Sequence, residues 1–115
     1  INYDKQDNIS DTTKYEDHFV AENRLIAISK SGRSMDSEDV QNFLKATERG
    51  IDVQLFVRKN KDDKISKEFY YLGRVIATGN AKQFVMPNTD KTAVEIEWEL
   101  ETPVREDIYQ YIVNE

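Results

Sequence analysis

The stretch that decides the fold is IDVQLFVRKNKDDKISKEFYYLGRVIA, residues 51–77. Its two halves alternate with a period of two on either side of Lys59–Glu68, a segment in which seven of ten residues are charged. This pattern is typical of two strands joined as a hairpin. A regular second strand places Tyr71 on the same face as Val75, and Tyr70 on the opposite face. Because an isolated hairpin is only marginally stable in water, we expect other strands and a helix to pack against it.

Upstream of the hairpin, residues 35–49 show the clearest helical pattern. Four residues recur at the spacing i, i+3, i+4, i+7, which predicts one face packed on a sheet: Val40, Phe43, Leu44 and Thr47. Gly50 follows at the position where a left-handed residue ends many helices. Before this helix we expect a strand at Arg24–Ser29 and one helical turn at Tyr15–Val20.

Downstream, AVEIEWELE at residues 93–101 is the clearest strand of the chain. One face carries four apolar residues: Val94, Ile96, Trp98 and Leu100. The other face carries four glutamates: Glu95, Glu97, Glu99 and Glu101. A strand with this alternation buries one side and turns the other to solvent. We therefore expect the four carboxylates to face water and to repel DNA.

Turn signals separate the remaining elements. We expect turns at Gly79-Asn80 and at Pro87–Asp90. Between them, residues 84–86 form a short strand or line a loop. Arg105–Val113 is expected as a short helix, with a strand as the alternative.

Together these elements predict an α+β fold. It consists of a mainly antiparallel, strongly curved sheet or partial barrel, with one main helix and a short C-terminal helix. Residues 1–14 are polar and are expected as a linker or flexible N-terminal segment. Residues 15–115 are expected to form a single domain. The chain starts with Ile, which suggests a piece of a longer protein.

Composition disfavours several classes of function. The 115 residues include no Cys, which removes disulfides, thiolate metal sites and a Cys nucleophile. This composition fits a cytoplasmic protein. His18 is the one His of the chain and stands in a polar segment, so a catalytic base has little support. We expect a non-catalytic domain with no metal and no cofactor.

Charge is distributed unevenly along the chain. The net charge is −6, which on its face argues against nucleic acid. Residues 24–91, however, contain 13 basic and 9 acidic side chains, whereas the two flanks contain 3 basic and 13 acidic side chains. A solvated surface with uneven charge is one interpretation. The other is a basic central surface that contacts phosphates.

Candidate DNA-binding residues come from separate parts of the sequence. The polar loop after the first strand could hold a phosphate with hydroxyls and cations, and it contains Ser29, Lys30, Ser31, Arg33 and Ser34. An ordinary turn before a helix is the alternative. Further cations lie in and beyond the hairpin: Arg58, Lys59, Arg74 and Lys82. Candidate rings for stacking on an unpaired base are Tyr70, Tyr71 and Trp98, although a core position is the alternative for each, above all for Trp98.

Three blocks of the chain carry a family resemblance: LFVRK at residues 55–59, YYLGRV at 70–75 and VEIEWELETPV at 94–104. In this order, and downstream of the Ser-containing loop, they resemble the C-terminal domain of SauUSI-type type IV restriction endonucleases. These enzymes fuse a phospholipase-D-type nuclease to a DEAD-box helicase motor. The YLG block is also similar to a strand of the SRA domains, which belong to the PUA-like barrels.

The resemblance implies a reader of 5-methylcytosine or 5-hydroxymethylcytosine in duplex DNA, which flips the modified base into a pocket. The nuclease and the ATP-dependent helicase would be other domains of the same parent chain. A different class of function stays open, namely a protein-interaction module that docks on the motor or on another subunit. The acidic face at residues 95–101 would then be its surface.

Overall fold

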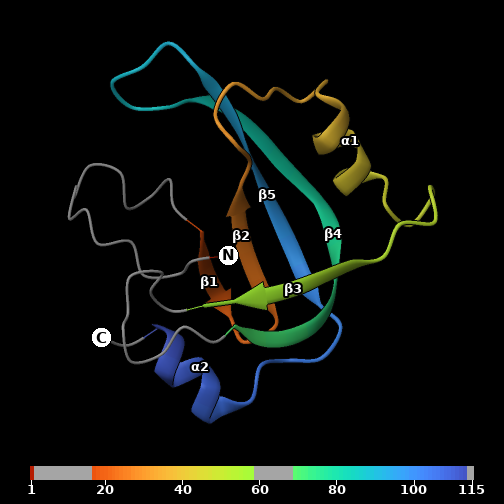
Figure 1. The fold of residues 1–115 in the computed structure, drawn as a ribbon, viewed down its shortest axis with the longest axis vertical. Coiled ribbons are helices and arrows are strands. Elements are labelled where there is room, and N and C mark those ends of the chain that lie inside the picture. The colour runs from red at the N-terminus through yellow and green to blue at the C-terminus, as the bar shows by residue number, and fades with distance from the viewer. Residues whose placement is uncertain (2–16, 59–68, 114–115) are drawn as a thin grey trace.

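The computed structural model describes residue 1, residues 17–58 and residues 69–113. The predicted hairpin loop and residues 2–14 of the predicted linker lie outside this part of the chain. Within it the element order is β1 (His18–Ala21), β2 (Arg24–Ile28), α1 (Glu38–Leu44), β3 (Val53–Val57), β4 (Tyr70–Val85), β5 (Thr92–Leu100) and α2 (Glu106–Val113). The strands form one antiparallel sheet in the order β1-β2-β5-β4-β3. The sheet curls until β3 crosses over β2 and β5, which confirms the predicted α+β fold with a strongly curved sheet (Figure 1).

Strand β5 lies at the centre of the sheet, between β2 and β4. The four apolar residues of its predicted inner face are each at most 5% exposed. They join one core with residues from the other strands, from both helices and from Val104: Phe19, Leu25, Val40, Leu55, Val57, Val75 and Ile112. The alternation of β5 therefore decides which face of the sheet is concave and apolar.

Strand β4 belongs to two strand pairs. Residues 70–75 pair with β3, and the stretch from Val75 to Val85 pairs with β5. Residues 84–86 are thus mostly a continuation of this long strand. The predicted turn at Gly79-Asn80 is wrong, because these residues form a bulge inside β4 where Thr78–Asn80 oppose the single residue Glu97. Gly79 adopts a φ of +100°, which an L side chain rarely tolerates.

A second bulge in β4 changes the faces of the hairpin. Register shifts between Leu55 and Phe56, so that Gly73 opposes Leu55 but Tyr71 opposes Phe56. One extra residue in a strand moves all preceding side chains to the other face. Tyr71 therefore leaves the face of Val75 and is 60% exposed, whereas Tyr70 pairs with the buried Val57. The regular alternation expected for residues 69–75 is wrong at this point.

Helix α1 is shorter than predicted, with seven residues in place of fifteen. After Leu44 the chain continues in hydrogen-bonded turns to Gly50, which has the expected positive φ of 69°. The N–H of Ile51 donates to the carbonyl of Ala46, and the N–H of Gly50 donates to that of Thr47. This pair of bonds is the Schellman arrangement of a helix end, so Gly50 acts as the predicted stop.

Of three further predictions about local structure, one is wrong and two are confirmed. The helical turn expected at Tyr15–Val20 is wrong, since His18–Ala21 form β1 and pair with β2. The turn at Pro87–Asp90 is present, and Asn88 takes a φ of 61° there. The C-terminal segment is the helix α2 and not a strand. Neither helix, nor any other in the described residues, has the length and apolar character needed to cross a membrane.

The core position of Leu100 gives a test of the fold. Its side chain is 2% exposed and lies opposite Val75. We expect Leu100→Ala to lower the free energy of unfolding by about 2–5 kcal/mol, because the truncation leaves a cavity between β4 and β5. Val85→Ala, at a position that is 60% exposed, should change it by less than about 0.5 kcal/mol. Urea titrations of both variants measure the difference, and equal midpoints would contradict this core.

Candidate functional site

The concave side of the sheet contains an apolar hollow of about 370 Å³. It lies between β3 on one side and β2 and β5 on the other, with α1 at one end. Most of its lining is aliphatic. Phe56 of β3 also lines it, together with two rings that contact each other: Phe43 from α1 and Trp98 from β5. Their centroids are 5.5 Å apart at an interplanar angle of 81°, an edge-to-face contact. This size and lining are typical of a small-molecule site.

Polar groups at the hollow come from Ser29 and from β3. The hydroxyl of Ser29 donates to the carbonyl of Lys30 and accepts from the N–H of Val94, which fixes its position. On β3 the carbonyl of Phe56 accepts from the amino group of Ile1. Backbone groups alternate in direction along a strand. The N–H and C=O of Gln54, two residues earlier, therefore point away from β4 along the same edge, where Gln54 lines the hollow.

The polar loop that follows β2 is held against β5. The N–H groups of Ser29 and Gly32 donate to the carbonyls of Val94 and Thr92, at 2.8 and 2.7 Å. The Thr92 hydroxyl in turn donates to the carbonyl of Arg33 at 2.8 Å. Both N–H groups are therefore already hydrogen-bonded within the fold. The loop therefore offers a phosphate its exposed side chains, Lys30 and Ser31, more readily than its backbone.

The loop end that leads into α1 is also bonded internally. The Ser37 hydroxyl accepts from the N–H of Ser34 at 2.9 Å. Arg33 forms an ion pair with Asp39 at 2.8 Å. That contact holds the pKa of Asp39 below its ordinary value, chiefly through the hydrogen bond from the guanidinium. Arg33 and Ser34 thus shape the start of α1, and neither lines the hollow.

The predicted cations do not converge on one surface. Arg74 on β4 lies 2.9 Å from Asp52 and 3.6 Å from Glu101. Lys82 lies opposite Glu95 in the β4–β5 register. Arg58 follows β3 and stacks over the ring of Phe69. Lys59 lies outside the described residues. Two of these cations directly adjoin lining residues of the hollow in the sequence: Lys30 follows Ser29, and Arg74 precedes Val75.

The predicted rings are likewise separated. Trp98 is 5% exposed and lines the hollow. Tyr70 lies at the opposite end of the core, where its ring meets Tyr111 of α2 edge-on at 5.8 Å. Tyr71 is on the outer face of β3 and β4, and its hydroxyl donates to the Gln54 side chain at 2.5 Å. Of the three, only Trp98 is part of the hollow.

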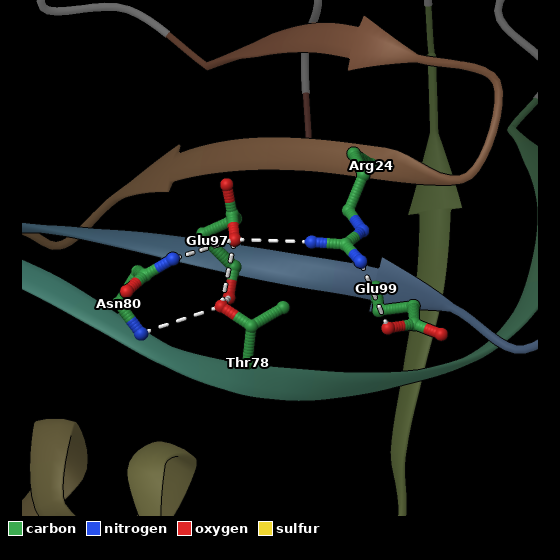
Figure 2. Close-up of polar contacts among 5 residues, drawn as sticks. All are labelled: Arg24, Thr78, Asn80, Glu97 and Glu99. Atoms are coloured by element: carbon green, nitrogen blue, oxygen red, sulfur yellow. Dashed lines mark hydrogen bonds and ion pairs between the residues drawn. The ribbon is translucent and has the colours of Figure 1, made fainter.

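The convex face of the sheet carries a charged network that sequence reasoning missed. Arg24 on β2 contacts Glu97 and Glu99 of β5, both at 3.2 Å. The carboxylate of Glu97 also accepts from the Thr78 hydroxyl at 2.8 Å and from the Asn80 amide at 3.0 Å (Figure 2). Thr78 and Asn80 come from the bulge of β4. The network therefore links three neighbouring strands, and the glutamates expected to face water alone are partly neutralised.

There are identifiable reasons why the sequence did not indicate several residues of the hollow and of the convex network. The hollow also contains Phe43, Ala27 and Gln54, which the sequence presents as a helix stripe and as ordinary strand positions. Arg24 begins a strand, but its partners depend on the β2–β5 register. Glycines inside the β4 pattern were the available signal for bulges. No group of three or more acidic or His side chains suited to a metal ion occurs in the part of the chain that the structure describes.

The Glu97 contacts predict a pH-dependent contribution to stability. Hydrogen bonds from Thr78 and Asn80, with the charge of Arg24, lower the pKa of Glu97 below its ordinary value of 4.5. A carboxyl whose pKa falls on folding stabilises the fold above its unfolded pKa, and this contribution is lost as pH falls through its folded pKa. We expect Glu97→Gln to be less stable than wild type at pH 7.

The difference in the free energy of unfolding should shrink as pH falls below 4.5. Urea titrations at pH 7 and at acidic pH measure it. Glu106→Gln, at an exposed position of α2, is the control and should show no such change. A Glu97→Gln difference that is the same at both pH values would contradict the role of the charge.

Comparison with known families gives one result. The family model described as "Domain of unknown function (DUF3427)" matches residues 1–112. No curated protein matches the chain. The match extends from Ile1 to Ile112, so it includes every strand, the hollow, the network on the convex face and most of α2. The chain therefore belongs to the DUF3427 family.

Proposed function

We propose that this domain recognises 5-methylcytosine or 5-hydroxymethylcytosine in duplex DNA, and that the modified base flips into the hollow of the curled sheet. The domain is non-catalytic in this proposal and targets a parent restriction enzyme of the SauUSI type, whose nuclease and motor lie elsewhere. The observation that carries the proposal is the hollow itself. It is concave, apolar and bordered by two aromatic rings, on a sheet that curls as a partial barrel.

The energetics of flipping set what the hollow must supply. Extruding a base costs a few kcal/mol in lost stacking and pairing. The rings of Trp98 and Phe43 and the aliphatic walls offer contacts that offset this cost. The extra methyl group contributes only about 0.8 kcal/mol when buried. Discrimination therefore requires hydrogen bonds to the base edge as well, and the Gln54 main chain offers a donor and an acceptor side by side at the rim.

Phosphate contacts are assigned to the cations that flank the hollow. Lys30 is exposed directly after the lining residue Ser29, whereas Arg58, at the end of β3, lies over the ring of Phe69. Arg33 and Arg74 each face a carboxylate, so a phosphate would have to compete with Asp39 or with Asp52 for them. We therefore assign the main electrostatic contribution to Lys30, beside the hollow.

The alternative, a protein-interaction module, would use the acidic convex face. Two of its carboxylates, Glu97 and Glu99, are bonded to Arg24, and Glu101 faces Arg74. Much of the negative charge that would attract a basic partner is thus balanced within the chain. The acidic face has a structural role in joining the strands, and the base-reading function has the stronger support.

Filling the hollow provides a direct test. Ala27 lines it on β2, so we expect Ala27→Phe to occupy the space and abolish the preference for a methylated duplex over the same unmodified duplex. Ile26→Phe adds a ring to the neighbouring residue, whose side chain faces the other way, and should keep the preference. Fluorescence anisotropy with both duplexes measures it, and thermal melting reports folding. Equal affinity of the wild type for the two duplexes would refute the proposal.

Salt dependence tests the phosphate contacts. Each neutralised phosphate contributes close to one unit to the slope of log affinity against log salt. We expect Lys30→Ala to reduce that slope by about 1 with a methylated duplex. Arg105→Ala is the matched control, because Arg105 lies at the start of α2, paired with Asp107, and should leave the slope unchanged. A slope unaltered by Lys30→Ala would remove Lys30 from the interface.

A further inference from the structure

A second surface lies on the outer side of the same hairpin. Its inward residues, Leu55 and Val57, are at most 7% exposed, whereas Phe56 between them is 49% exposed. Four outward side chains form two contacting pairs that we term the outer aromatic patch: Phe56 with Tyr71, and Arg58 with Phe69. Phe69 and Tyr71 are 48% and 60% exposed. Large apolar rings gathered at the surface generally mark a binding site.

The geometry of the outer aromatic patch is regular. Phe56 and Tyr71 are opposed in the register, with ring centroids 5.0 Å apart and an interplanar angle of 40°. Two positions further along, beyond the Val57–Tyr70 pair, the guanidinium carbon of Arg58 lies 4.6 Å from the centroid of the Phe69 ring. The Tyr71 hydroxyl donates to Gln54, which holds that ring in place. Along the two strands, a pair of neighbouring rings is therefore followed by a ring that contacts a cation.

The chemistry of these four residues favours unpaired nucleotides over an apolar partner. Successive bases stack on exposed aromatic rings, while cations contact the intervening phosphates. Arg58 adds a positive charge to the patch, in cation–π contact with the Phe69 ring. None of the four side chains is acidic. An aliphatic docking patch would instead be expected to have Leu, Ile or Val at these positions.

We propose that the outer aromatic patch binds single-stranded DNA. Bases stack on Phe56 and Tyr71, and Arg58, supported by Phe69, faces a phosphate. The choice of DNA over other single strands rests on the proposed function, but only Phe56 of the patch also lines the hollow, and Phe69 and Tyr71 lie outside it. A strand separated from its complement can therefore occupy the patch whether or not the hollow contains a base.

The test uses the full chain and a fluorescein-labelled strand of about twelve thymidylates, with binding followed by fluorescence anisotropy. Base–ring stacking is worth roughly 1–3 kcal/mol per base, which corresponds to a loss of about 5-fold or more in affinity for Tyr71→Ala or Phe56→Ala. Tyr71→Phe keeps the ring but removes the hydrogen bond to Gln54, and should bind as the wild type does. Val85→Ala is the control, because Val85 is as exposed to solvent as Tyr71.

The outcomes separate this proposal from the previous one. Ala27→Phe should lose the preference for methylated duplex while it still binds the thymidylate strand, and Tyr71→Ala should show the reverse. The proposal is overturned if Tyr71→Ala and Phe56→Ala bind the strand as tightly as the wild type. It is equally overturned if Tyr71→Phe loses as much affinity for the strand as Tyr71→Ala does, because loss of the hydrogen bond to Gln54 would then explain the effect. A shift from dimer to monomer in sedimentation, with strand binding unchanged, would instead assign the patch to self-association.

Discussion

The structure depends on one constraint, which is that β4 must pair with β3 along its first part and with β5 along its second. If this 16-residue strand were straight, the sheet would be flat and these partners would stay on opposite sides of β4. Two bulges, at Leu72-Gly73 and at Thr78–Asn80, give β4 the bend that it needs. The bend brings β3 over the concave face (Figure 1). The hollow lies between β3 and the β2–β5 pair, which supply most of its lining residues.

Each bulge also has a chemical consequence. The bulge at Gly73 turns Tyr71 outward, so that its ring joins Phe56 on the outer side of β3. The bulge at Thr78–Asn80 places a hydroxyl and an amide beside Glu97, where they bond the carboxylate that Arg24 also contacts (Figure 2). The curvature that forms the hollow is thus linked to an ionic network on the convex face and to an aromatic patch beside the hairpin.

Much of this fold could be predicted from local patterns. The alternation of β5 identified its buried face, and the stripe at Val40, Phe43 and Leu44 identified the helix, with Gly50 at its end. These signals depend on a few consecutive residues and on elementary geometry. The length of α1 was overestimated, because residues 45–50 keep hydrogen-bonded turns without continuing a regular helix.

The site was harder to predict, because it depends on register and not on composition. A regular period of two placed Tyr71 with Val75, and one extra residue in β4 reversed that assignment. From the sequence, Arg74 and Arg33 were predicted to contact phosphates. In the fold, carboxylates contact both of them: Asp52 and Glu101 contact Arg74, and Asp39 contacts Arg33. Ala27 and Gln54 carry no signal at all until the sheet curls and places them beside Trp98.

The most direct measurement of the central claim uses Trp98, the single Trp of the chain, as a probe inside the hollow. Its fluorescence is followed during titration with a duplex that contains one 5-methylcytosine and with the same duplex unmodified. Because a base that enters the hollow meets the indole, we expect strong quenching by the modified duplex and little by the unmodified one at equal occupancy. Equal changes with both duplexes, or binding of the modified duplex without any change at Trp98, would contradict it.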